Sequence, residues 1–223
     1  MIVILNQEQI KKAISLDESL ISIIENAFIS LSEGKVTTPP IMRLDIPEFH
    51  GEADVKTAYI KGLDSFAIKI ALGYFNNPSR GLPTSNGLMI LFNSETGSLK
   101  AVLLDQGYLT DIRTAVAGAI ASKYLANVEV DSVGIIGVGM QAKLQLEALM
   151  MVRKPTTANI WGRDKKKVEA YIETMKKKLK INFVISEKIK QVCEKSDILI
   201  TTTPSTEPLI KYDWLKKGIH ITA

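Results

Sequence analysis

The residues best suited to chemistry form a glycine-rich segment at residues 137–142, which reads GVGMQA. An apolar run precedes this segment and a helical pattern of apolar residues follows it. In that setting Gly137 permits a tight turn, Gly139 lets the backbone approach a phosphate, and Ala142 allows a helix to pack closely on a strand. The segment therefore predicts a cradle for the pyrophosphate of a dinucleotide. The structural alternative is a tight turn from strand to helix that binds nothing.

The end of the next expected strand, residues 161–164, reads WGRD and bears on which dinucleotide is bound. A carboxylate usually stands here and bonds the ribose 2′-hydroxyl of NAD(H). Gly162 occupies that position instead, and Arg163 with Lys165 can pair with a 2′-phosphate. We therefore predict NAD(P) as cofactor and favour NADP(H), while Asp164 keeps NAD(H) as an alternative. The alternative role for Arg163 is that of an exposed cation at a helix start.

From residue 128 onward, the elements that must position these residues alternate strictly between strand and helix. Such alternation predicts right-handed crossovers and a parallel, Rossmann-type sheet. Strands are expected at residues 132–137, 158–161, 182–185, 198–203 and 219–222, and helices at 140–151, 165–179 and 186–195. Because the sequence ends directly after the last of these strands, the sheet is expected to be incomplete at its C-terminus.

The first half of the chain predicts a sheet covered by helices. Apolar runs separated by Gly, Pro and Asn predict strands at 59–60, 65–72, 87–93 and 101–104, which can form a meander with a turn at 94–97. Helical periodicity is clear at 8–31, interrupted near residues 16 and 17, and at 109–125. The expected fold class is α/β, with an N-terminal α+β domain at residues 1–126 and a Rossmann domain at residues 127–223.

Composition argues against several classes of protein. Hydrophobic types make up 46% and charged types 23% of the 223 residues, which is typical of a globular chain with a sizeable core. No apolar run approaches the roughly 20 residues of a membrane-spanning helix, and Asn6 interrupts the apolar start, so neither a membrane partner nor a signal peptide is expected. The single cysteine, Cys193, fits a reducing compartment, and we predict a cytoplasmic protein.

Neither a metal nor a nucleic acid is expected as a ligand. His50 lies in a polar loop at residues 48–52 without a second His or a Cys nearby, which makes it a poor metal ligand. The net charge of +4 comes largely from lysine runs at 165–167 and 176–178, which fit a solvated helix face. Nucleic-acid binding would instead predict basic residues interleaved with exposed aromatics, and aromatics make up only 6%.

Several motifs together resemble the ornithine cyclodeaminase/mu-crystallin family, and the resemblance covers essentially the whole chain. They are residues 37–40 (TTPP), 66–69 (FAIK), 81–84 (GLPT), 109–115 (LTDIRTA), 137–142 and 201–204 (TTTP). The most specific is the combination of the arginine-threonine helix start with the glycine segment that follows it. Within the family, residues 50–59 (HGEADVKTAY) and 107–111 (GYLTD) look most like the branch of ectoine-utilisation proteins.

The resemblance implies an enzyme that pairs a substrate-binding and dimerisation domain with a Rossmann domain, forms a homodimer through the first domain, and has its active site in the cleft between the two. It implies that Arg43 and Lys69 bind the carboxylate of a small amino acid, while Arg113 lies where carboxylate and cofactor meet. A fork of cations can fix such a carboxylate and aim the Cα hydrogen at the nicotinamide. The positions that match cofactor contacts are Thr84, Met140, Gln141 and Thr203.

The implied chemistry begins with hydride transfer from the Cα of the amino acid to nicotinamide, which gives an imine. In cyclodeaminases the imine is attacked internally, ammonia leaves and hydride returns; in dehydrogenase or imine-reductase members the redox change is net. The sequence does not separate these outcomes. The family's proton-handling aspartate follows the fifth Rossmann strand, beyond Ala223, so the catalytic residue is unknown and the truncated chain is expected to be inactive. The alternative is a mu-crystallin-like protein that binds NADP(H) and a small carboxylate without turnover.

Two further residues bear on the side chain of the substrate. Family cyclodeaminases that act on ornithine use an acidic residue in the early sheet to hold the distal ammonium, and Asp54 lies near that position. Lys56 follows two residues later, so alternation in a strand would place both side chains on one face. We therefore expect Lys56 to neutralise Asp54 or to bind an anionic distal group, which argues against ornithine as the substrate.

Overall fold

The computed structural model describes residues 2–223 and divides into two compact units. The first comprises Met1–Ser15 and Ile23–Thr110, and the second Leu16–Ser22 and Asp111–Ala223. Helix α3 (Tyr108–Leu125) belongs with the second unit from Asp111 onward, because its Ala115 and Ala119 pack with Ala148 of α4 (Met140–Val152). The expected boundary between a substrate-binding domain (residues 1–126) and a nucleotide-binding domain (residues 127–223), just after the end of α3, stays a prediction.

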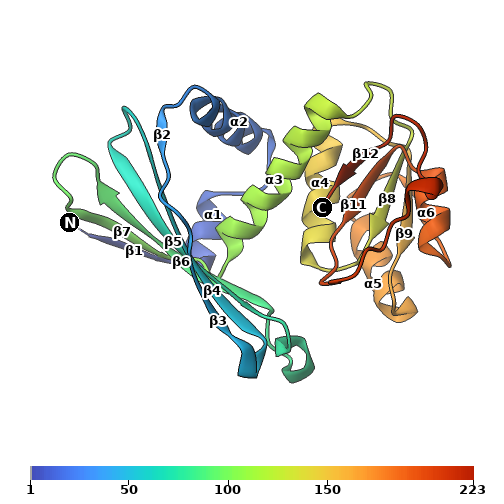
Figure 1. Ribbon diagram of the computed structural model, residues 1–223, viewed down its shortest axis with the longest axis horizontal. Helices are drawn as coiled ribbons and strands as arrows, with labels where there is room; N and C mark the ends of the chain where they lie inside the picture. The colour runs from blue at the N-terminus through green and yellow to red at the C-terminus, as the bar shows by residue number, and fades with distance from the viewer. Residues whose placement is uncertain (1) are drawn as a thin grey trace. The chain divides into compact units, whose positions relative to one another are not determined.

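The first unit is built on a seven-stranded sheet (Figure 1). Its middle is an antiparallel meander of β4 (Gly51–Ile60), β5 (Ser65–Tyr74), β6 (Ser85–Asn93) and β7 (Leu99–Leu104). This confirms the expected meander, but β4 is much longer than residues 59–60 and begins inside the expected polar loop. Its first part alternates charged residues with small and apolar ones, a pattern that conceals a strand when only apolar runs are sought.

Three strands of this sheet were not expected from the sequence. β1 (Val3–Asn6) runs parallel to β7, while β2 (Val36–Thr37) and β3 (Met42–Ile46) pair antiparallel with β4. All three are short and mostly exposed, as edge strands are. β2 and β3 carry no long apolar run, and the apolar start that contains β1 ends at Asn6. The interrupted helix is confirmed as α1 (Gln7–Ala13) and α2 (Glu18–Ser32), and the remaining 3-10 turns are η1 (Pro47–Phe49), η2 (Asn77–Arg80) and η3 (Tyr212–Trp214).

The second unit contains a parallel five-stranded sheet in the order β10-β9-β8-β11-β12. Its strands are β8 (Ser132–Ile136), β9 (Thr157–Trp161), β10 (Asn182–Ile185), β11 (Ile198–Thr201) and β12 (His220–Thr222). All five expected strands are present, which confirms the Rossmann-type prediction. The strand order reverses between β8 and β11, so the carboxyl ends of these two strands flank the switch point where such sheets bind ligands.

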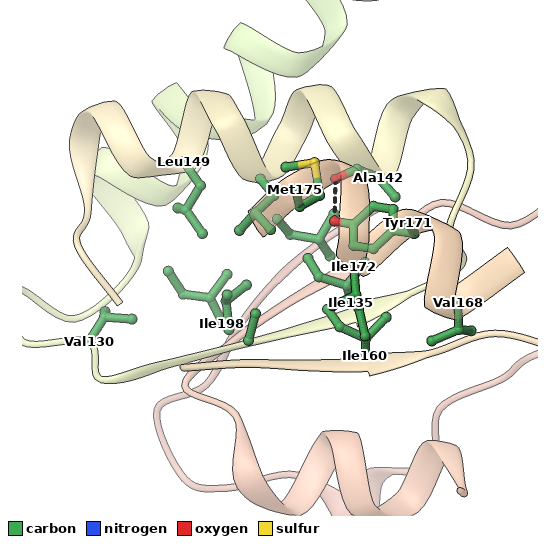
Figure 2. Packing of buried hydrophobic residues seen from close by; sticks show 14 of the residues in the cluster. Val130, Ile135, Ala142, Leu149, Ile160, Val168, Tyr171, Ile172, Met175 and Ile198 are labelled. Carbon is green, nitrogen blue, oxygen red and sulfur yellow. Dashed lines mark hydrogen bonds between the residues drawn. The ribbon is translucent and has the colours of Figure 1, made fainter. Parts of the chain in front are cut away.

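Helices cover both faces of the parallel sheet. Buried side chains of α4 and α5 (Lys165–Lys176) form one apolar cluster with Ile135, Ile160 and Ile198, whereas α6 (Ile189–Lys195) packs on the other face against Ile136 and Leu199. Figure 2 shows the first cluster, in which the Tyr171 hydroxyl donates a hydrogen bond of 3.1 Å to the carbonyl of Ala142. This bond ties α5 to the first turn of α4, directly after the glycine segment.

Replacing Tyr171 with Phe should lower the free energy of unfolding by about 1 kcal/mol, because a buried hydrogen bond is lost while the ring packing is retained. Tyr171 is 1% exposed, and Tyr212→Phe is the matched control because Tyr212 is 88% exposed. Urea denaturation of both variants measures the difference. If Tyr171→Phe unfolds like the control, the link from α5 to α4 does not stabilise the fold.

Candidate functional site

The turn between β8 and α4 requires its first glycine. Gly137 has φ +99°, and a Cβ atom there would lie 2.6 Å from the backbone oxygen of Thr202 at the end of β11. No side chain tolerates so close an approach to backbone. The Gly137 N–H donates to the carbonyl of Trp161 at 2.9 Å, so the turn is fixed to β9 as well.

The second glycine leaves the start of α4 open. Gly139 is the N-cap of this helix, no side chain caps it, and a Cβ atom there would meet nothing within 4 Å. The first N–H groups of a helix lack partners within the helix and carry its positive dipole end. Ala142 is fully buried, as close packing of α4 on the sheet requires. Backbone donors, open space and positive potential together suit a phosphate group.

Two threonines border this turn at the end of β11. The predicted strand extended through Thr203 but ends at Thr201, and the next two residues, Thr202 and Thr203, lie against Gly137. The Thr202 hydroxyl oxygen is buried and has no hydrogen-bond partner among residues 2–223. Such an orphan group calls for a partner such as water or a ligand. Thr202 was not singled out from the sequence, because nothing in a run of three threonines distinguishes the one whose hydroxyl is buried.

Gln141 connects the glycine segment to the start of α3. Its side-chain amide donates to the backbone carbonyl of Asp111 at 3.2 Å and to its carboxylate at 3.1 Å, and it accepts a bond of 3.4 Å from Gln145. Arg113 follows two residues after Asp111, and the residue as a whole is exposed. Partial burial of its guanidinium lowers the pKa of Arg113, and the negative charge of Asp111 opposes this effect. Met140 is 60% exposed at the first position of α4.

A side chain at position 162 would crowd two valines at the end of β9. A Cβ atom on Gly162 would lie 2.9 Å from a methyl of Val168 and 3.2 Å from one of Val138. The Asp164 carboxylate caps α5, accepting from the backbone N–H of Lys166 at 2.9 Å and of Lys167 at 3.3 Å. Arg163 is exposed and, within the part of the chain that the structure describes, forms no hydrogen bond or ion pair.

In the first unit, the predicted substrate-binding cations share one face of the sheet. Arg43 on β3 pairs in register with Asp54 on β4, and Lys56 on β4 pairs with Lys69 on β5. Residues that pair across strands, or stand two apart in one strand, point to the same side. The expectation that Asp54 and Lys56 share a face is therefore confirmed.

Carboxylates neutralise much of this positive charge. The Arg43 guanidinium contacts Asp45 at 2.9 Å and Glu52 at 2.6 Å, and the bond to Asp45 is the main reason its pKa is raised. Lys56 contacts Asp54 at 2.9 Å, and this bond above all lowers the pKa of the Asp54 carboxyl despite its burial. Two carboxylates already engage Arg43, so less of its charge is left for a substrate carboxylate.

Thr84 lies at a separate hollow of the first unit. It lines a cavity of about 330 Å³. Leu72 and Tyr74 of β5 also line this cavity. Because side chains alternate along a strand, these two point to the opposite face of the sheet from Lys69. The cavity therefore borders the opposite face of the sheet from the cations. Its other lining residues are Phe49, Asn76, Asn77, Arg80 and Asn86.

Among residues 2–223 no three His, Cys, Asp or Glu side chains gather in a way that could hold a metal ion. None of the helices formed by these residues is long and apolar enough to cross a membrane.

Comparison with known proteins decides the family. A model of the ornithine cyclodeaminase/mu-crystallin family matches residues 2–223. The chain belongs to the ornithine cyclodeaminase/mu-crystallin family. A putative dehydrogenase of Rhizobium meliloti is a relative in sequence, 47% identical over 99% of this chain and 67% of its own length.

Two solved structures of the family resemble the chain closely. Thermococcus litoralis Δ1-pyrroline-2-carboxylate reductase, in complex with NADH and L-proline, has a TM-score of 0.93 and 32% identity, covering 99% of this chain and 68% of that one. An archaeal alanine dehydrogenase dimer with bound NAD has a TM-score of 0.90 and 33% identity, covering 99% and 66%. The chain thus spans about two thirds of the length of the family members it matches.

Proposed function

We propose that the protein is a nicotinamide-dependent enzyme that acts at the Cα-amine of a small amino acid. The observation that carries the proposal is the glycine turn from β8 to α4, whose second glycine leaves the N-terminus of the helix open at the switch point of a parallel sheet. Similarity to a reductase in complex with NADH and L-proline and to an alanine dehydrogenase with NAD supports it.

In this proposal the residues of the second unit hold the dinucleotide. Gly137 and Gly139 admit its pyrophosphate to the backbone donors of α4, and Thr203 and Met140 border the same turn. Gln141 fixes the start of α3 through Asp111, which orients the helix turn that carries Arg113. When bound, nicotinamide supplies the group that accepts or donates a hydride.

Lys69 and Arg113 are each proposed to bind the substrate carboxylate. Lys69 lies in the middle of a central strand, where the flanking strands limit its movement, and Arg113 is a permanently charged guanidinium with a fork of donors. A carboxylate fixed by such groups leaves the Cα hydrogen in a defined direction, which lowers the entropic part of the barrier to hydride transfer. Ring closure with loss of ammonia and net amino acid oxidation both begin from this bound state, and the proposal includes both.

Lys69→Ala and Arg113→Ala should each lower kcat/KM about ten- to a hundredfold in the full-length protein, because a charge-assisted hydrogen bond in a site contributes roughly 1.5–3 kcal/mol. The assay follows both NAD(P)H absorbance and ammonia release with a panel of small amino acids. Lys100→Ala is the control, since Lys100 lies on β7 and pairs with Asp64, the residue just before β5.

Activity within twofold of wild type for both variants would remove these residues from the site. Dinucleotide binding without turnover of any amino acid or imine in the panel would favour instead a mu-crystallin-like binding protein.

We also propose that NADP(H) is preferred over NAD(H). Gly162 stands where the ribose-binding acid would stand, Asp164 is occupied as a helix cap, and Arg163 is available for a 2′-phosphate. The two solved relatives contain NADH and NAD, so the proposal gives this chain a cofactor preference that differs from the dinucleotides bound in them.

Arg163→Ala should weaken NADPH binding about ten- to a hundredfold and leave NADH binding nearly unchanged, because only NADPH offers a 2′-phosphate to the guanidinium. Fluorescence titration of both dinucleotides measures the two affinities. Lys190→Ala, which removes an exposed cation from α6, is the control. Equal weakening of both dinucleotides, or a wild-type preference for NADH, would contradict the assignment.

Assembly as a homodimer through the first unit, a cytoplasmic location and membership of the ectoine-utilisation branch stay predictions. For the dimer, supporting observations are the exposed apolar side chains of the outer strands and their flanks. They are Ile2, Val3, Ile4, Ile41, Met42 and Leu44, each more than 40% exposed. The first three lie on or beside β1 and the last three on or beside β3, at opposite edges of the sheet. Exposed apolar side chains at a sheet edge are typical of a protein interface.

A further inference from the structure

A chain of side-chain hydrogen bonds connects α4 with the start of α3. Gln145 donates from Nε2 to the Oε1 of Gln141 at 3.4 Å, and Gln141 donates to the Asp111 carboxylate at 3.1 Å. Gln141 also donates to the backbone carbonyl of Asp111 at 3.2 Å. The chain thus leads from a buried position of α4 to the first turn of α3, two residues before Arg113.

The amide of Gln145 is not explained by packing. Gln145 is 5% exposed and contacts α3 at Gly118, although the two helices otherwise pack through alanines. Its Oε1 is buried and accepts no hydrogen bond from any of residues 2–223. An unpaired buried acceptor destabilises a fold, and an apolar side chain of the same length would avoid that cost. The amide therefore calls for a role of its own.

That role is to orient the amide of Gln141. The oxygen and nitrogen ends of an amide have nearly the same shape, so hydrogen bonds decide which end faces which neighbour. Because Gln145 donates to the Oε1 of Gln141, the Nε2 of Gln141 faces Asp111. In the reverse orientation, Oε1 would face the oxygens of Asp111, and acceptors facing each other repel.

The orientation of Gln141 matters for Arg113, because Asp111 is a negative charge that acts on the Arg113 guanidinium. Within the described residues 2–223, Arg113 nevertheless donates no hydrogen bond and forms no ion pair. Gln141 engages the carboxylate of Asp111, which would compete for Arg113 if it were released. The donors of the guanidinium thus stay open to a substrate carboxylate.

We propose that Gln145 is a positioning residue, which through Gln141 and Asp111 keeps Arg113 available for the carboxylate of the substrate. This inference rests on the proposed function, because it takes Arg113 to bind that carboxylate. It explains why a buried amide with an unpaired oxygen stands between two helices that pack through small apolar residues.

Gln145→Met tests the proposal in the full-length protein, because methionine keeps the length of the side chain and removes the amide. For the best substrate of the amino acid panel, KM should rise about three- to tenfold, as expected for one neutral hydrogen bond, while kcat stays within about twofold. Dinucleotide affinity should change less than about twofold, and the melting temperature should not fall, because an unpaired oxygen is removed with little change in volume.

A double-mutant cycle shows whether Gln145 acts through Arg113. In the Arg113→Ala background, Gln145→Met should change kcat/KM by less than about twofold, because the group that it positions is absent. Leu149→Met is the matched control, since Leu149 lies about one turn further along α4, is 1% exposed and carries no amide. This control should leave KM within about twofold of wild type.

The outcomes separate the two proposals. An unchanged KM in Gln145→Met, an equal rise of KM in Leu149→Met, or an undiminished effect in the Arg113→Ala background contradicts this inference and leaves the proposed function standing. A lower melting temperature together with weaker dinucleotide binding would show a structural role for Gln145 and also contradicts it. No effect of Arg113→Ala on kcat/KM contradicts instead the proposed role of Arg113, and this inference with it.

Discussion

The close approach of two backbone segments, at Gly137 and Thr202, is the constraint on which the nucleotide site depends. Only a residue without a side chain fits between β8 and the end of β11, and its positive φ turns the chain directly into α4. The helix therefore starts at the switch point of the sheet, with uncapped N–H groups facing open space at Gly139. Burial of Ala142 and the hydrogen bond from Tyr171 hold this first turn against the core.

The two units handle charge in different ways. In the second unit, the positive potential comes from backbone donors and from Arg163, and the first turn of α4 carries no acidic residue. In the first unit, the cations of the sheet are accompanied by carboxylates on the same face, so Arg43 and Lys56 are largely neutralised. A site of paired charges gives up affinity for simple ions but gains selectivity, because a ligand must match both signs.

The second unit was predictable from the sequence because its central strands β8, β9 and β11 are buried and largely apolar, and the order of strand and helix limits the topology. The first unit was harder. β3 is short and exposed at an edge of the sheet, and β4 alternates charged with small and apolar residues. β1 is apolar but only four residues long and mostly exposed. Likewise, the sequence indicated which cations to examine, but the ion pairs of Arg43 and the buried oxygens of Asp54 and Thr202 depend on three-dimensional packing.

The central claim is that the open space above Gly139 receives a dinucleotide, and Gly139→Val tests it most directly. The backbone of Gly139 is extended and a Cβ atom would meet no protein atom within 4 Å, so the variant should fold with an unchanged melting temperature. The added methyl groups would occupy the space of the pyrophosphate. Calorimetric titration should therefore show NADPH and NADH binding at least about a hundredfold more weakly, which corresponds to a loss of roughly 2.7 kcal/mol of binding free energy or more. Unchanged affinity in a folded Gly139→Val protein would contradict the account.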